Sequence, residues 1–107
     1  MKIVRTNPFL KALKRAGADE GDLRALESEL QRNPDSGDVI PGTDGIRKIR
    51  FAIGNRGKRG GGRAIYVAIK IRDTIYLLTA YAKNQKEDLT AEDKKVWNAV
   101  VKELKDG

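Results

Sequence analysis

"RAIYVAIKIRDTIYLLTAYA", residues 63–82, is the stretch that decides the fold. β-Branched residues occupy every second position of its first half: Ile65, Val67, Ile69 and Ile71. Such alternation is typical of a strand with one buried face. The second half, residues 74–82, is apolar at both parities, which suits a strand covered on both sides. The short "RD" at 72–73 predicts that the two strands form an antiparallel hairpin.

A further strand precedes this hairpin. Its apolar side chains share one parity and its basic side chains the other: Ile49, Phe51 and Ile53 against Lys48 and Arg50. The segment 54–62 connects it to the hairpin, so we expect a three-stranded antiparallel meander. "KIVRT", residues 2–6, is a candidate short edge strand.

Two helices are expected before the meander. Asn7 is the expected N-cap of the first, which has Pro8 at its first position and ends at Gly17. The second begins at Asp19 and ends at "NP", residues 33–34. Its leucines recur at helical spacing: Leu23, Leu26 and Leu30. The N-terminal third is therefore predicted to be a helical hairpin.

A third helix is expected at the C-terminus. Thr90 is its N-cap, with Asp93 three positions later. One face of it is apolar: Val96, Trp97, Val100, Val101 and Leu104. The sequence thus predicts a single α+β domain over residues 1–107 in the order β-α-α-β-β-β-α. A small antiparallel sheet of three to four strands would pack against the N-terminal helical hairpin and the C-terminal helix.

Cysteine and histidine are absent from the 107 residues. This argues against a disulfide framework, a zinc centre and a serine or cysteine triad. No apolar run approaches the roughly 18 residues of a membrane span, and the N-terminus lacks the apolar core of a signal peptide. We therefore expect a cytoplasmic protein that has no membrane contact and uses no metal or other cofactor.

Basic side chains concentrate in the middle of the chain. The net charge is +7, and residues 45–72 contain nine basic residues and no acidic one. Such a one-signed stripe attracts a polyanion and gains affinity by releasing its counterions, so nucleic acid is the leading partner class. We expect these cations to gather on one open surface. The alternative is a solvated basic face that serves solubility alone.

"GNRGKRGGGR", residues 54–63, combines four cations with five glycines. It lacks the G-x-x-x-x-G-K-[ST] spacing of a phosphate-binding P-loop. Glycine is kept where another backbone must approach closely, so the segment is interpreted as a clamp on a polyphosphate chain. The alternative is a disordered hairpin tip with incidental charge.

Without histidine or thiols, acid and base chemistry falls to lysine and tyrosine. RNA suits this combination because its own 2′-hydroxyl can be the nucleophile. A lysine crowded by cations has a lowered pKa, whereas arginine stays charged and clamps developing negative charge. In the predicted hairpin, Arg63 at the start of one strand lies near Tyr81 and Lys83 at the end of the other.

Each of these residues also has a structural interpretation. Tyr81 can be a strand-end residue with its hydroxyl in water, and Lys83 a lysine on the approach to the last helix. Tyr66 and Tyr76 are interpreted as packing residues, with stacking on a base as the alternative.

Three segments resemble the HigB branch of the RelE/ParE toxin superfamily: "GDVIPGTDGIRKIRF" (37–51), "RGKRGGGRAIYV" (56–67) and "TIYLLTAYAKNQKEDLT" (74–90). The match runs from about Leu23 to Leu104. The resemblance implies an α+β toxin of a bacterial toxin–antitoxin pair, partnered by a HigA-like helix-turn-helix antitoxin. It also implies ribosome-dependent endoribonuclease activity on messenger RNA, without metal.

The resemblance places the family's strand-opening arginine on Arg63 and its "Y-x-K-N" segment on Tyr81, Lys83 and Asn84. It makes Lys58 the loop lysine that acts in catalysis or contacts phosphate. It implies that Arg63 stabilises the pentacovalent phosphate, that Tyr81 activates the 2′-hydroxyl or stacks on a base, and that Lys83 or Lys58 completes proton transfer.

The same resemblance implies that further residues contact RNA of the message or the ribosome: Lys48, Arg50, Arg56, Arg59 and Asn84. Two other functions stay open at this point. A ParE-like poison of DNA gyrase shares the fold and acts through protein contact. A non-catalytic regulator would bind RNA or the ribosome through the same basic stripe.

Overall fold

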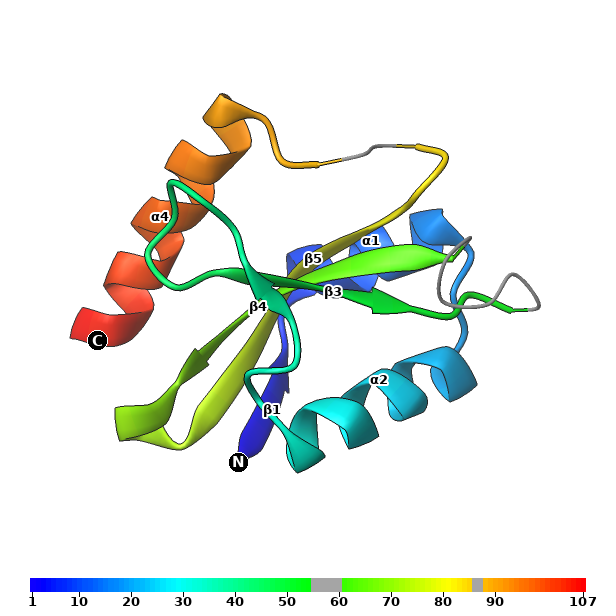
Figure 1. Ribbon diagram of the computed structural model, residues 1–107, viewed down its shortest axis with the longest axis horizontal. Helices are drawn as coiled ribbons and strands as arrows, with labels where there is room; N and C mark the ends of the chain where they lie inside the picture. Colours follow the sequence, from blue (N-terminus) through cyan, green and yellow to red (C-terminus); the bar gives the residue numbers. More distant parts are fainter. Residues whose placement is uncertain (55–60, 86–87) are drawn as a thin grey trace.

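The computed structural model describes residues 1–54, 61–85 and 88–107 (Figure 1). In chain order its elements are β1 (Lys2–Arg5), α1 (Asn7–Ala16), α2 (Glu20–Arg32), β2 (Asp38–Val39), β3 (Arg47–Phe51), β4 (Gly62–Ile69), a 3₁₀ turn (Lys70–Arg72), β5 (Thr74–Ala82) and α4 (Ala91–Asp106). The predicted α+β class is confirmed. Within the described ranges, no helix is both long and apolar enough to cross a bilayer.

The five strands form one sheet in the order β1-β5-β4-β3-β2. Strands β3, β4 and β5 pair antiparallel, which confirms the meander, and β1 is the expected edge strand. The expectation of three to four antiparallel strands was wrong in two respects. The two-residue β2 adds a strand beside β3, and β1 runs parallel to β5, so the sheet is mixed. Strand β2 escaped prediction because two residues in a turn-rich segment carry no periodicity.

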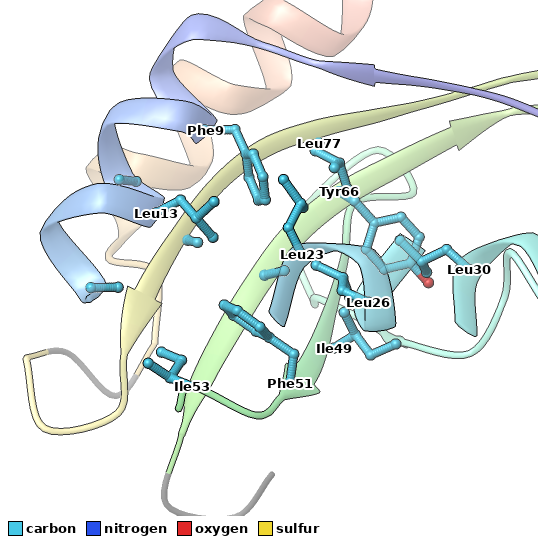
Figure 2. Close-up of a cluster of buried hydrophobic side chains, with 14 of the residues drawn as sticks. Phe9, Leu13, Leu23, Leu26, Leu30, Ile49, Phe51, Ile53, Tyr66 and Leu77 are labelled. Atoms are coloured by element: carbon cyan, nitrogen blue, oxygen red, sulfur yellow. The ribbon is translucent and has the colours of Figure 1, made fainter. Parts of the chain in front are cut away.

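Helices cover both faces of the sheet (Figure 1). The pair α1 and α2 packs on one side, called here the hairpin face, and α4 packs on the other, called the α4 face. Figure 2 shows Phe9 and Leu23 from the two helices gathered with Phe51 and Tyr66 of the sheet. Tyr66 is fully buried, and its hydroxyl donates to Pro34 O at 2.8 Å. Its interpretation as a packing residue is therefore confirmed.

Helix ends follow the predicted caps with one exception. Thr90 with Asp93 forms the expected capping box of α4, and Asp19, the expected start of α2, forms a second capping box with Asp22. The N-cap of α1, however, is Thr6 and not Asn7. The Thr6 hydroxyl accepts from the Phe9 N–H at 3.3 Å and donates to Leu77 O at 2.7 Å. The cap thus also joins α1 to β5, a contact that sequence spacing cannot reveal.

A β-bulge interrupts the pairing of β4 with β5. Ile65 pairs with Thr79 and Tyr66 with Leu77, which leaves Leu78 as an extra residue. The bulge reverses the parity of β5, so Leu77 lies in the core of the hairpin face and Leu78 in that of the α4 face. This explains why β5 is apolar at both parities. Ile71, expected inside the alternating strand, instead lies in the 3₁₀ turn and is 93% exposed.

Candidate active site

One row of side chains crosses three strands on the α4 face. Arg50 of β3 pairs with Arg63 of β4, and Arg63 pairs with Tyr81 of β5. Directly paired residues project to the same side of an antiparallel sheet, so these three side chains, called here the site row, lie beside one another. Exposure increases along the row, because Tyr81 is buried, Arg63 half-buried and Arg50 exposed. The sequence-predicted neighbours Arg63 and Tyr81 are thus brought together.

A polar groove of about 570 Å³ opens at the β3 end of the site row. Its basic lining consists of Lys48, Arg50 and Arg63. Lys48 pairs with Ile65, which places it one step along β3 from Arg50 on the same face. Glu29 and Asp38 contribute carboxylates to the same groove. The basic side chains that line the groove therefore outnumber its two carboxylates, and the groove can receive an anionic chain.

Arg63 is positioned by the glycine that precedes it. A Cβ on Gly62 would lie 2.6 Å from Ile53 Cδ1 and 3.0 Å from Tyr81 O, so no larger residue fits there without displacement. The Arg63 guanidinium donates from Nη1 to Gly62 O at 3.0 Å. Close packing of Gly62 thus sets where β4 begins and from which point the Arg63 side chain extends.

Tyr81 is held in its neutral form. Burial raises its pKa to about 12, the negative charge of Asp88 adds to the rise, and the positive charge of Arg63 partly opposes it. Only 6% of the residue is exposed. A phenol with this pKa is a poor base near neutral pH, and a ring so buried has little surface on which a base could stack. The arrangement suits a hydrogen-bond or proton donor.

Asp88 is a site residue that sequence reasoning missed. Its Oδ2 accepts from Lys48 Nζ at 3.0 Å, across 40 positions of sequence. Burial alone would raise the pKa of Asp88, but hydrogen bonds from Lys48 and the Leu89 N–H and the charges of Lys48 and Lys94 outweigh it and hold that pKa below its ordinary value. In the sequence, Asp88 is covered only by the segment 74–90 that carries the family resemblance.

Two described cations of the basic stripe, Arg47 and Lys70, are bound elsewhere and do not join the site row. Arg47 donates to Gly37 O at 2.7 Å, and Lys70 Nζ donates to Asp35 Oδ2 at 2.9 Å. Asp35 also lies 3.6 Å from Arg47 Nη2, so one carboxylate ties both cations to the loop after α2. The expectation of one open cationic surface was wrong for these residues, because acids distant in sequence fold back onto them.

Two further predicted residues follow β5. Lys83 and Asn84 are exposed in the turn that follows Tyr81, and the Lys83 N–H donates to Gly61 O at 3.0 Å. Arg56, Lys58 and Arg59 lie outside the described residues. In the described part of the chain, no three carboxylates are close enough together to hold a metal ion.

A comparison with protein families matches residues 1–106 to the family described as "RelE toxin of RelE / RelB toxin-antitoxin system". The match spans all the elements of the structure, from β1 to α4. It implies that an antitoxin is the partner of this protein. The chain belongs to the RelE toxin family and is the toxin of a toxin–antitoxin system.

Proposed function

We propose that this toxin is a ribosome-dependent endoribonuclease of the HigB branch, which cleaves messenger RNA without a metal and is neutralised by a HigA-like antitoxin. The observation that carries the proposal is the site row. Arg63 lies between an exposed cation, Arg50, and a neutral phenol, Tyr81, on one face of the sheet. A positive clamp beside a proton donor is what cleavage of RNA by its own 2′-hydroxyl requires.

The reaction proceeds in line at phosphorus. The 2′-oxygen attacks, its proton passes to a base, the bond from phosphorus to the 5′-oxygen breaks, and that oxygen takes up a proton. The products are a 2′,3′-cyclic phosphate and a 5′-hydroxyl. Arg63 stabilises the negative charge of the pentacovalent phosphate, because its guanidinium remains charged throughout. Arg50 and Lys48 hold neighbouring phosphates, with Arg56, Arg59 and Asn84 as further RNA contacts.

Proton transfer is divided between Tyr81 and a lysine. Tyr81 carries its proton at neutral pH because its pKa is about 12, so it donates to the leaving 5′-oxygen. Lys83 follows Tyr81 closely in the turn, and Lys58 belongs to the glycine-rich segment. One of these two lysines accepts the proton of the 2′-hydroxyl. Alanine variants of each, assayed separately, decide which one is the base.

The decisive experiment is primer extension on messages in a translation extract. We expect Arg63→Ala to reduce cleavage by about 100- to 1000-fold, the usual effect of removing one group that stabilises transition-state charge. Arg24→Ala is the matched control, because Arg24 lies on α2 with its side chain 77% exposed. Equal cleavage by a folded Arg63→Ala protein would exclude this residue from the mechanism.

The same extract separates the other functions. DNA breaks dependent on gyrase, with intact messages, would identify a gyrase poison. Salt-sensitive binding to ribosomes without new 5′ ends would identify a non-catalytic regulator.

A further inference from the structure

The carboxylate of Asp88 lies against one cation of the polar groove. Its Oδ2 is 3.0 Å from Lys48 Nζ, and Lys48 lines the groove together with Arg50 and Arg63. The negative charge of Asp88 also acts on Tyr81, the buried end of the site row. An acid from the segment before α4 therefore lies among the groups proposed to hold RNA.

Asp88 is fixed in this position. Its Oδ1 accepts from the Leu89 N–H at 2.8 Å, so both carboxylate oxygens are engaged. Leu89 is 7% exposed and packs with Tyr81 in the core of the α4 face. Thr90, the next residue, caps α4. The carboxylate is therefore held from both sides, unlike an acid at the end of a freely rotating surface side chain.

Lys48 is close enough to the site row to contact the same RNA strand. Two residues along a strand span about 7 Å, which is close to the spacing of successive phosphates in an extended chain. Lys48 and Arg50 are separated by one residue, Ile49, and share a face. A phosphate seated at Arg50 would bring the next phosphate toward Lys48.

We propose that Asp88 occupies, in the free toxin, the position at Lys48 that an RNA phosphate takes on binding. The inference rests on the proposed function, because that function supplies the RNA. Carboxylate and phosphodiester oxygens both accept a charge-assisted hydrogen bond from an ammonium group, so one anion can replace the other. Asp88 is thus an internal competitor that lowers RNA affinity.

Replacement of one anion by the other has a measurable salt signature. When a phosphate displaces Asp88, the freed carboxylate attracts a cation from solution, which offsets the counterion that the phosphate releases. Lys48 then contributes little to the salt dependence of binding. In an Asp88→Asn protein the offset disappears, and the slope of log K against log salt should steepen by about 0.7, the value for one added phosphate contact on a single strand.

The experiment measures binding of a 2′-O-methyl RNA oligonucleotide, which cannot be cleaved, by fluorescence anisotropy at several salt concentrations. We expect Asp88→Asn to bind about twofold to fivefold more tightly at low salt, in line with an exposed charge pair. Asp106→Asn, at the far end of α4, is the matched control and should leave affinity unchanged. Asp88→Ser provides a second variant if Asp88→Asn fails to fold.

A double substitution tests whether the effect passes through Lys48. In a Lys48→Met protein, Asp88→Asn should change RNA affinity by less than about twofold, because the ammonium group for which Asp88 and the phosphate compete is no longer present. The same tightening with and without Lys48 would overturn the proposal in favour of general repulsion. Loss of cleavage with unchanged binding would also overturn it, since Asp88 would then act in the chemistry.

Two further outcomes distinguish this inference from the proposed function, and a third overturns the inference directly. Normal message cleavage, with no change of affinity in Asp88→Asn, overturns the inference alone. Tightened binding by Asp88→Asn, with no cleavage by the unsubstituted toxin, overturns the proposed nuclease alone. Absence of salt-dependent RNA binding by the unsubstituted protein overturns the inference directly, because Lys48 would have no phosphate to receive.

Discussion

Burial decides the chemistry of single residues at this site. Tyr81 and Arg63 are neighbours across two strands, yet one is buried and the other half-buried. The sequence identified both residues, because in an antiparallel pair joined by a short turn the start of the first strand lies opposite the end of the second. It did not predict that Tyr81 would be too buried to act as a base. The burial of Tyr81 depends on packing against Leu89 and α4, which follow it in the sequence.

Tyr81 predicts an alkaline weakness of the fold. The folded protein raises the pKa of this phenol from 10.0 to about 12, so it holds the proton more tightly than the unfolded chain. The resulting stabilisation is fully present below about pH 10 and is lost as the pH rises toward 12. Urea unfolding measured between pH 10 and 12 should show that the free energy of unfolding falls less steeply with pH in Tyr81→Phe than in the unsubstituted protein. An identical alkaline slope in both proteins would contradict the assigned pKa.

At the scale of elements, features that depend on neighbouring residues could be predicted from the sequence. Features that depend on contacts between distant segments could not. The capping box of α4 and the start of α2 at Asp19 were predicted because the residues that form each cap lie within three positions of each other. The N-cap of α1 was wrongly predicted because the hydrogen bond that fixes Thr6 in the cap position joins it to Leu77 of β5, 71 positions away. The bulge at Leu78 could not be predicted for the same reason, because it arises from the register in which β4 and β5 pair and not from the sequence of either strand alone.

The double role of Thr6 gives a comparison among three variants. Thr90→Ala removes a cap and should lower the free energy of unfolding by about 1 kcal/mol. Thr6→Ala removes a cap and also leaves Leu77 O without its 2.7 Å bond, so we expect a loss of about 2 kcal/mol. Asn7→Ala should be nearly neutral. Urea denaturation orders the three, and a loss for Asn7→Ala as large as that for Thr6→Ala would contradict the assigned cap.

At the scale of the whole molecule, the sequence predicted the amount of positive charge better than its distribution. The basic stripe of residues 45–72 has no acid within it, yet Asp35 reaches Lys70 and Asp88 reaches Lys48 in the folded protein. These partners are 35 and 40 positions apart. The fold thus determines which cations are paired with acids and which remain open to an anionic ligand. Ion pairs between residues so far apart in the sequence depend on the topology of the fold.

The two acids also make the fold sensitive to low pH. The hydrogen bond from Lys70 is the main cause that lowers the pKa of Asp35, and Lys48 is the main partner that lowers the pKa of Asp88. A carboxylate with a lowered pKa stabilises the fold above its ordinary value of 3.8 and loses that contribution as the pH falls through its folded value. The free energy of unfolding should therefore decrease as the pH falls below about 4.

Both acids are largely exposed, so salt must weaken this dependence. At about 1 M salt the screening length is roughly 3 Å, and much of the attraction in each ion pair is lost. We expect the decrease in stability at low pH to be shallower in high salt, and shallower at low salt in the double variant Asp35→Asn/Asp88→Asn. Asp106→Asn removes a carboxylate that forms no ion pair with the described residues and is the control. If the double variant and the control lost stability equally steeply, the two ion pairs would play no part in holding the loops to the sheet.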